Sequence, residues 1–248
     1  MSKETFKDQQ FLLGLFGGVA VVAIIGLVIL GIAFINISKN SKGAVRGEQA
    51  DQPAVNANNN AAANNNNNNQ PNGPIDLKVT KDDHILGNFD APITLLEWSD
   101  FQCPYCARFH EAVKQIMSEY SGRVRWVFRN FPLDSIHPNA RIASEAAECA
   151  NDQGKFWEFS DAVFVDQPGL GAGGATFLKQ TAEKVGLEAS KFTSCLNDGK
   201  YKNKVEQQEQ AGIAAGVQGT PGSFLNGVAL GGALPYESLK AQIDALLK

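Results

Sequence analysis

The sequence predicts an α/β domain that contains a helical insertion and is preceded by one N-terminal transmembrane helix and a disordered linker. Three observations predict this organisation. Residues 11–37 are almost wholly apolar, an asparagine-rich tract follows them, and the rest of the chain alternates strand and helix patterns. We therefore divide the chain into a tail (1–10), a transmembrane anchor (11–37), a linker (38–75) and a folded domain (76–248).

The predicted anchor is long enough to cross a bilayer. At a rise of about 1.5 Å per residue, an apolar helix of this length spans a hydrocarbon core of roughly 30 Å. The run exceeds the apolar core of a typical signal peptide, and no small-residue cleavage site directly follows it. We therefore expect an uncleaved membrane anchor rather than a signal peptide or a buried core helix.

The linker and the composition indicate a tethered domain that does not bind nucleic acid. Residues 56–72 are dominated by asparagine and lack the apolar periodicity that a packed core requires, so this tract should be a disordered tether. The formal net charge is −4 and the basic residues are scattered, which argues against nucleic-acid binding. Residues 76–248 have the size of one ordinary domain.

A C-x-x-C motif stands where a predicted strand meets a predicted helix. Residues 93–98 form a short apolar run, and apolar side chains recur at helical spacing from Phe109 to about Tyr120. Cys103 would lie at the helix N-terminus, where backbone N–H groups stabilise a thiolate and lower the pKa of the thiol. Cys106, one turn later, should be less exposed. A zinc site would require a second ligand pair, and none follows, so redox chemistry is favoured.

The remaining elements follow in order. Residues 123–129 alternate charged and apolar side chains, as in a strand with one buried face. A hairpin is expected over residues 223–230 because Asn226-Gly227 favours a tight turn. The glycine-rich run 169–174 matches G-x-G-x-x-G but does not follow a strand, so we expect a flexible loop there. Helices are predicted at 138–150, 155–165, 175–185, 189–196 and 201–215, with a last one around Leu239–Leu247.

This order predicts a thioredoxin fold with a helical insertion at about residues 136–215. The chain also resembles the DsbA-like thiol:disulfide oxidoreductases across residues 77–248. The resemblance is carried by residues 90–92 and 97–106, by Glu145–Ala150, by Gln153–Trp157 and by Gly219–Pro221. It implies the inserted helical domain, an extracytoplasmic location and a cis peptide bond before Pro221.

The resemblance and the residues together predict the roles at the site. Cys103 is expected to be the nucleophile and Cys106 the resolving thiol. The resemblance places the acidic Glu97 beneath the dithiol, where burial would raise its pKa and let it relay a proton for Cys106. Strongly oxidising DsbA proteins carry a histidine where Tyr105 stands, so the resemblance does not predict extreme oxidising power for this chain. Further support at the site is expected from Pro104, Tyr105, Thr220 and Pro221.

The other cysteines and the histidines permit fewer conclusions. Cys149 and Cys195 favour a second, structural disulfide, because an even count suits an exported protein, although two buried free thiols are the alternative. His110 follows Cys106 by one helical turn and could touch the thiolate or bind a metal, but a packing role is favoured. His84 and His137 are isolated and suggest no function.

The sequence therefore predicts a membrane-anchored, extracytoplasmic thiol:disulfide oxidoreductase, most simply a disulfide-forming oxidase. Counting basic residues on either side of the anchor slightly favours the opposite topology, but the cysteine chemistry suits an oxidising compartment. Isomerase or reductase activity, a Cys/His metal-binding module and a peptide-binding chaperone are the alternatives. The expected partners are client proteins with free or mispaired cysteines and a quinone-linked reoxidase of the DsbB or vitamin K epoxide reductase type. We expect no cofactor and no metal.

Overall fold

The computed structural model describes residues 74–248. The predicted tail, the anchor at 11–37 and the linker up to residue 73 lie outside the described residues. Among residues 74–248, no helix combines the length and apolar character needed to span a membrane. The described part of the chain forms seven helices and one five-stranded sheet, so the mixed α/β architecture is confirmed.

The sheet has the strand order β1-β3-β2-β4-β5. Strands β2 and β3 are parallel, and the other neighbouring pairs are antiparallel. Strand β1 was not predicted, because its four residues at the edge of the sheet are too few to show a periodic pattern. The strands are β1 His84–Gly87, β2 Ile93–Ser99, β3 Val124–Asn130, β4 Gly222–Leu225 and β5 Val228–Ala229.

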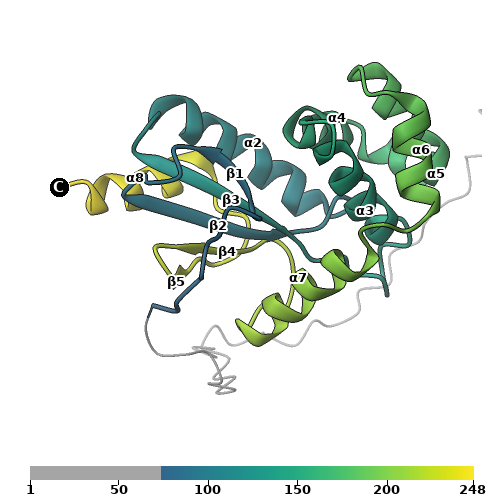
Figure 1. The fold of residues 1–248 in the computed structure, drawn as a ribbon. Coiled ribbons are helices and arrows are strands. Elements are labelled where there is room, and N and C mark those ends of the chain that lie inside the picture. The colour runs from purple at the N-terminus through teal and green to yellow at the C-terminus, as the bar shows by residue number, and fades with distance from the viewer. Residues whose placement is uncertain (1–73) are drawn as a thin grey trace, which may run out of the picture. The chain divides into compact units, whose positions relative to one another are not determined.

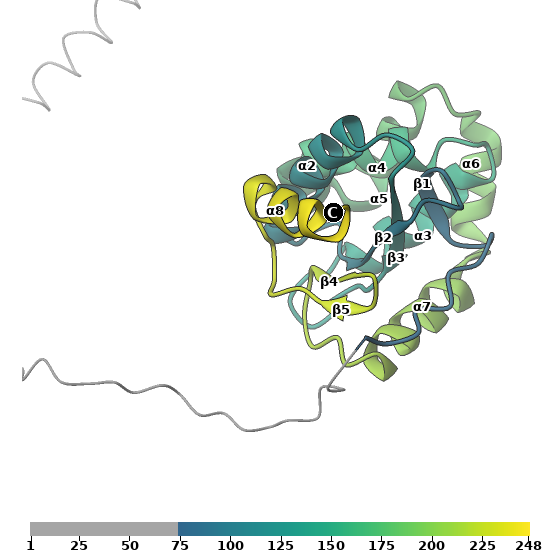
Figure 2. The ribbon, with the colours of Figure 1, turned by 90° about the vertical axis from the view of Figure 1, so that its left-hand side faces the viewer.

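Helices cover both faces of the sheet, as Figures 1 and 2 show. Helices α2 (Pro104–Glu119) and α8 (Tyr236–Leu246) pack together on one face, and α7 (Lys202–Ala214) lies on the other. Gly212 on α7 allows this close approach, because a Cβ there would lie 2.6 Å from the Phe131 ring. The central strand β2 is buried along its whole length as a result.

The four remaining helices gather beyond one end of the sheet (Figure 1). They are α3 (Ala140–Asn151), α4 (Phe156–Val165), α5 (Gln167–Lys184) and α6 (Ala189–Asn197), and all lie between β3 and β4 in the chain. Small residues on α3 let its neighbours pack closely, and the same hydrophobic core continues from these helices to α2 and the sheet. The buried alanine and serine residues of α3 are Ala140, Ala143, Ser144, Ala146, Ala147 and Ala150.

The glycine-rich run is helical over residues 169–173, so the loop predicted there was wrong. Helix α5 begins at Gln167, and the chain departs from helical geometry at Gly174, where φ is +48°. The Asp166 carboxylate caps the helix by accepting a hydrogen bond from Gly169 N–H at 2.8 Å. Asn139 donates to the Leu170 carbonyl at 3.0 Å. Because glycine has a low helix propensity, the local pattern predicted a loop. These two contacts offset that low propensity.

Candidate active site

The two cysteines of the motif lie at the start of α2. Cys103 is the N-cap residue, and Pro104 occupies the first turn, where a missing N–H leaves no donor unpaired. Both cysteines are free thiols, with 4% of Cys103 and none of Cys106 exposed. The Thr220–Pro221 peptide bond is cis, and Cys103 Sγ lies 3.4 Å from the Thr220 carbonyl oxygen. The fold thus brings the motif and Thr220, 117 residues apart, into contact.

The surroundings push the two thiols toward opposite protonation states. Hydrogen bonding from the Cys106 thiol, aided by backbone N–H groups at the helix start, lowers the pKa of Cys103 to about 5 against the opposing effect of burial. Burial raises the pKa of Cys106 well above its ordinary value. At neutral pH the site therefore holds one thiolate, at Cys103, next to one protonated thiol.

Glu97 lies inside the domain on β2, with no exposed surface. Trp126 Nε1 donates to Glu97 Oε2 at 3.1 Å, and Oε1 has no hydrogen-bond partner within residues 74–248. Burial raises the pKa of Glu97 to about 7. The negative charge of Glu97 in turn adds to the effect of burial on the pKa of Cys106, so the carboxyl and this thiol interact electrostatically. A carboxyl that titrates near neutral pH beside a protonated thiol can exchange protons with it.

Glu97→Gln should make the reduced protein more stable at about pH 8 and leave its stability unchanged near pH 4. The unfolded chain releases this proton near pH 4.5 and the folded chain near 7, so stability falls as pH rises between these values. The shift corresponds to about 3 kcal/mol, which the neutral amide would restore. Urea unfolding at both pH values measures the effect. The exposed Glu111→Gln on α2 is the matched control, and an equal effect of Glu97→Gln at both pH values would contradict the assignment.

Asp100 organises the turn that carries the motif, although the sequence patterns did not single it out. Its buried carboxylate accepts hydrogen bonds from Gln102 N–H at 2.7 Å, Leu133 N–H at 2.8 Å and His137 Nδ1 at 2.8 Å. Its backbone N–H points to Cys106 Sγ at 3.5 Å. An acidic residue between a buried strand and the motif was the available signal, but its partners are apparent only in the folded chain.

Gln167 supports the same turn from the inserted helices. Its Nε2 donates to the carbonyl oxygens of Phe101 at 2.8 Å and of Cys103 at 2.9 Å. Gln167 lies 64 residues after Cys103 in the chain, so no local sequence pattern could have identified it. The first residue of α5 therefore helps to hold the backbone of the nucleophile.

The two residues between the cysteines are exposed to solvent. Tyr105 is 55% exposed, and the Arg108 guanidinium lies 4.6 Å from the centre of its ring. Pro104 is also exposed. Cys106 and Glu97, by contrast, have no exposed surface.

The thiol pair follows the central strand β2 and contacts Thr220, the residue before the cis proline. The model of the family described as Thioredoxin matches residues 79–245. The chain belongs to the thioredoxin family. The thioredoxin-like fold expected from the element order is confirmed.

Solved structures similar to this domain include DsbA-type proteins. The α-DsbA1 protein from Wolbachia pipientis is 26% identical, with a TM-score of 0.61 over 68% of this chain and 93% of that chain. BdbD from Bacillus subtilis in its oxidised form is 24% identical, with a TM-score of 0.59 over 66% and 91%, and shows the fold alone. The likeness to α-DsbA1 supports an oxidoreductase.

Curated relatives of this thioredoxin-family domain carry a different name. Na(+)/H(+) antiporter NhaA 3 from Salinispora tropica is 37% identical over 174 residues, and NhaA 1 from Salinispora arenicola is 36% identical over 176 residues. The matches cover 69% and 70% of this chain, but only 26% of each antiporter. The chain thus spans about a quarter of the length of these relatives, and the comparison concerns that quarter.

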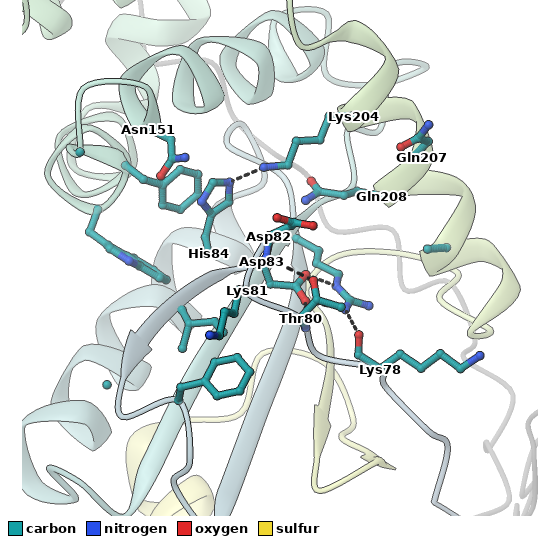
Figure 3. Close-up of a pocket in the computed structure, with 18 residues that line it drawn as sticks. Lys78, Thr80, Lys81, Asp82, Asp83, His84, Asn151, Lys204, Gln207 and Gln208 are labelled. Carbon is teal, nitrogen blue, oxygen red and sulfur yellow. Dashed lines mark hydrogen bonds and ion pairs between the residues drawn. The ribbon is translucent and has the colours of Figure 1, made fainter.

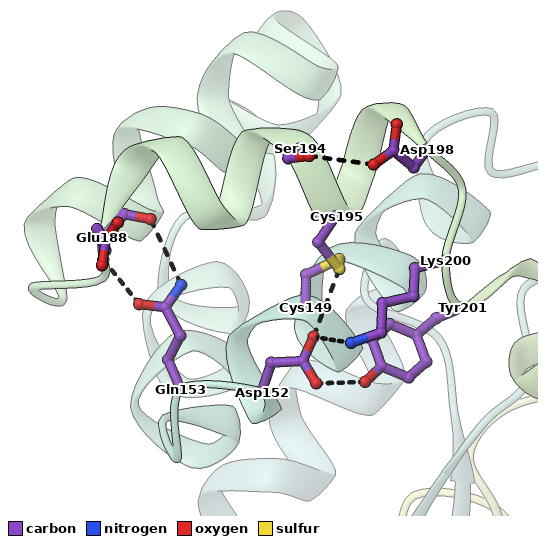
Figure 4. The surroundings of a disulfide bond; sticks show 9 residues. All are labelled: Cys149, Asp152, Gln153, Glu188, Ser194, Cys195, Asp198, Lys200 and Tyr201. Carbon is purple, nitrogen blue, oxygen red and sulfur yellow. Dashed lines mark hydrogen bonds and ion pairs between the residues drawn. A yellow bond between two sulfur atoms is a disulfide. The ribbon is translucent and has the colours of Figure 1, made fainter.

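The second cysteine pair of the thioredoxin-family domain is bonded (Figure 4). Cys149 on α3 and Cys195 on α6 form a disulfide with an S–S distance of 1.97 Å and a Cα–Cα distance of 5.9 Å. Asp152 lies beside it and accepts hydrogen bonds from Lys200 Nζ at 2.7 Å and from the Tyr201 hydroxyl. The bond therefore links two helices of the insertion and is separate from the dithiol at Cys103.

His110 is paired with a carboxylate of α4. Its buried ring packs against Trp126 and Phe164, and its Nε2 lies 2.6 Å from Asp161 Oδ1 on α4. Within the described part of the chain, no group of three or more His, Cys, Asp or Glu residues is placed to hold a metal ion. The pairing of His110 with Asp161 matches the packing role expected from the sequence and not a ligand set with Cys103 and Cys106.

Figure 3 shows a cavity of about 1120 Å³ whose lining includes His84 and Lys204. It is lined by residues before and along β1, by the turn between α3 and α4, and by α7, and it includes none of the thiol-site residues. His84 at its edge, which the sequence left without a role, contacts the buried Glu148 at 2.8 Å, and Lys204 contacts the same carboxylate at 2.7 Å. This network joins the sheet to the inserted helices.

Proposed function

We propose that this domain is an extracytoplasmic thiol:disulfide oxidoreductase that forms disulfides in client proteins and is held at the membrane by residues 11–37. The observation that carries the proposal is the opposite shift of the two thiol pKa values, with Cys103 lowered to about 5 and Cys106 raised. A thiolate that is stable at neutral pH stabilises the reduced pair relative to the disulfide. A protein with a stabilised reduced form tends to donate its disulfide.

Exchange begins with the Cys103–Cys106 disulfide. A client thiolate attacks Cys103 Sγ, the Cys103–Cys106 bond breaks, and a mixed disulfide joins Cys103 to the client. Cys106 leaves with the electron pair and takes a proton. Glu97, which is buried with a pKa of about 7 and interacts electrostatically with Cys106, would supply that proton.

The second step releases the oxidised client. A second client thiolate attacks the client sulfur of the mixed disulfide, and Cys103 departs as a thiolate. Two electrons have passed from two client thiols to the enzyme pair, and one disulfide has moved to the client. The low pKa of Cys103 makes it a good leaving group, so this step favours release.

The reduced dithiol must then pass its electrons to an oxidant. We place this role on a membrane quinone-linked partner of the DsbB or vitamin K epoxide reductase type, which a tethered domain could meet at the bilayer surface. The disulfide between Cys149 and Cys195 supports an oxidising compartment, where such bonds persist. Isomerase or reductase activity would use the same residues and differ in the reduction potential.

The reduction potential of the Cys103–Cys106 pair in the full-length chain tests the direction of electron flow. Equilibration against glutathione should give a value of about −120 to −180 mV, the range of DsbA and protein disulfide isomerase. A value of about −270 mV, near that of thioredoxin, would show that the protein mainly reduces disulfides. A Cys149→Ala/Cys195→Ala variant measured in parallel confirms that the signal arises from the dithiol.

A further inference from the structure

A buried carboxylate and a partly exposed histidine lie together behind the motif. Asp100 is fully buried at the end of β2, and His137 lies in the loop between β3 and α3 with 17% of its side chain exposed. Their side chains meet at 2.8 Å, from His137 Nδ1 to Asp100 Oδ2. Neither residue takes part in the exchange steps above.

We propose that His137 is a positioning residue of the dithiol, which acts through Asp100 and makes the stability of the Cys103 thiolate depend on the charge of the imidazole. The inference rests on the proposed function, since it concerns the same thiol pair. Its first support is the way in which Asp100 holds the turn.

Asp100 contacts the motif through both its backbone and its side chain. Its carbonyl oxygen accepts the Cys103 N–H at 3.1 Å, and its own N–H points to Cys106 Sγ at 3.5 Å. Its carboxylate accepts the Gln102 N–H at 2.7 Å. A change in the position of Asp100 therefore moves the backbone of the nucleophile and one contact of the resolving sulfur together.

The second support is charge. A buried carboxylate near a thiolate opposes the formation of that thiolate, because like charges repel more strongly away from water. Hydrogen bonds from three donors reduce this effect, and only His137 among those donors can also carry a positive charge. A positive charge on the imidazole offsets the charge of the carboxylate at 2.8 Å, so its loss would leave the carboxylate to oppose the thiolate.

The other charged groups around this loop are paired among themselves. Asp134 in the loop pairs with Arg141 on α3 at 2.5 Å, and Arg141 also contacts Glu206 and Glu209 on α7. In the described chain, Asp100 is the carboxylate that contacts His137, and Nε2 of the imidazole makes no hydrogen bond. Because the ring is partly exposed, it can exchange protons with solvent.

Two substitutions in the full-length protein separate position from charge. His137→Gln keeps a donor toward Asp100 but removes the positive charge, and His137→Leu removes both. Thiolate absorbance at about 240 nm, followed against pH in the reduced protein, gives the midpoint of Cys103 ionisation. We expect the midpoint to rise by about 0.5 to 1 pH unit in His137→Gln, a 3- to 10-fold weaker acid, and by more in His137→Leu.

A second measurement uses the unaltered protein, so the inference does not depend on the folding of a variant. If the imidazole stabilises the thiolate, the thiolate must stabilise the charged imidazole equally, because coupling free energies are reciprocal. The His137 ring signals, followed by NMR against pH, should therefore have a higher midpoint in the reduced protein than in the oxidised protein. Identical midpoints in the two redox states, or a thiolate midpoint unchanged in both variants, would overturn the inference.

The neighbouring Ile136→Ala is the matched control, because this side chain is 66% exposed in the same loop. Its thiolate midpoint should equal that of the unaltered protein, and a shift as large as that of His137→Gln would show a general effect of the loop and overturn the inference. These titrations require no client. A protein that shows the coupling but oxidises no client would therefore contradict the proposed function and not the role of His137.

Discussion

Cys103→Ser is expected to lower the rate of disulfide transfer to a reduced client by at least about 10³-fold, because the attacked sulfur and the redox-active bond are both removed. Cys106→Ser should behave differently. It keeps the Cys103 thiol at the helix start but lacks the buried thiol that resolves a mixed disulfide. Loss of client thiols over time, followed with the oxidised enzyme, measures transfer.

The two serine variants distinguish the roles of the cysteines. When mixed with an oxidised client, Cys106→Ser should accumulate a mixed disulfide with the client, which a reductant cleaves. Cys103→Ser should form almost none. Non-reducing electrophoresis detects the complex. If Cys103→Ser kept more than about a tenth of the transfer rate, the nucleophile would lie elsewhere and the exchange mechanism would be wrong.

Removal of the second disulfide is expected to have the largest effect on stability. Cys149 and Cys195 are separated by 46 residues, and a loop of that length corresponds to about 4 kcal/mol in the chain-entropy model. The Cys149→Ala/Cys195→Ala variant should therefore lower the free energy of unfolding by about that amount. Urea unfolding of both proteins, with the Cys103–Cys106 pair kept reduced, measures the difference.

The control for this experiment is the unaltered protein in strong reductant. It should lose about the same stability as the double variant, because both lack the cross-link but only one lacks the sulfur atoms. A loss below about 1 kcal/mol in both would show that the bond does not stabilise the domain. The reduction potential of the dithiol should not determine this result, since the two pairs are separate in the fold.

The sequence predicted those elements whose local pattern agrees with their tertiary surroundings. Helix α2 shows apolar side chains at helical spacing, and these side chains are the ones it buries. The last helix and the turn at Asn226-Gly227 follow the same rule. The local patterns of strand β1 and of the start of α5 did not predict them. Strand β1 is defined by its pairing with β3. The start of α5 is defined by capping from Asp166 and by contacts from Asn139.

The site divides in the same way. The cysteines, Glu97 and Pro221 lie in short motifs, so they could be named before their positions were known. Asp100, His137 and Gln167 act through hydrogen bonds to partners 33 to 66 residues away. A single sequence contains no signal for such pairs, since neither partner is unusual for its own surroundings.

Helix α7 also determines how this domain can be rebuilt. Its Gln208 accepts hydrogen bonds from both Asn130 nitrogens, at 3.0 and 2.8 Å, and its backbone oxygen accepts the Trp98 indole N–H at 2.8 Å. The inserted helices thus complete the hydrogen bonding of the two central strands. Removal of residues 136–215 to obtain a minimal thioredoxin would leave buried polar groups unpaired on β2 and β3. The insertion therefore cannot be deleted without destabilising the sheet.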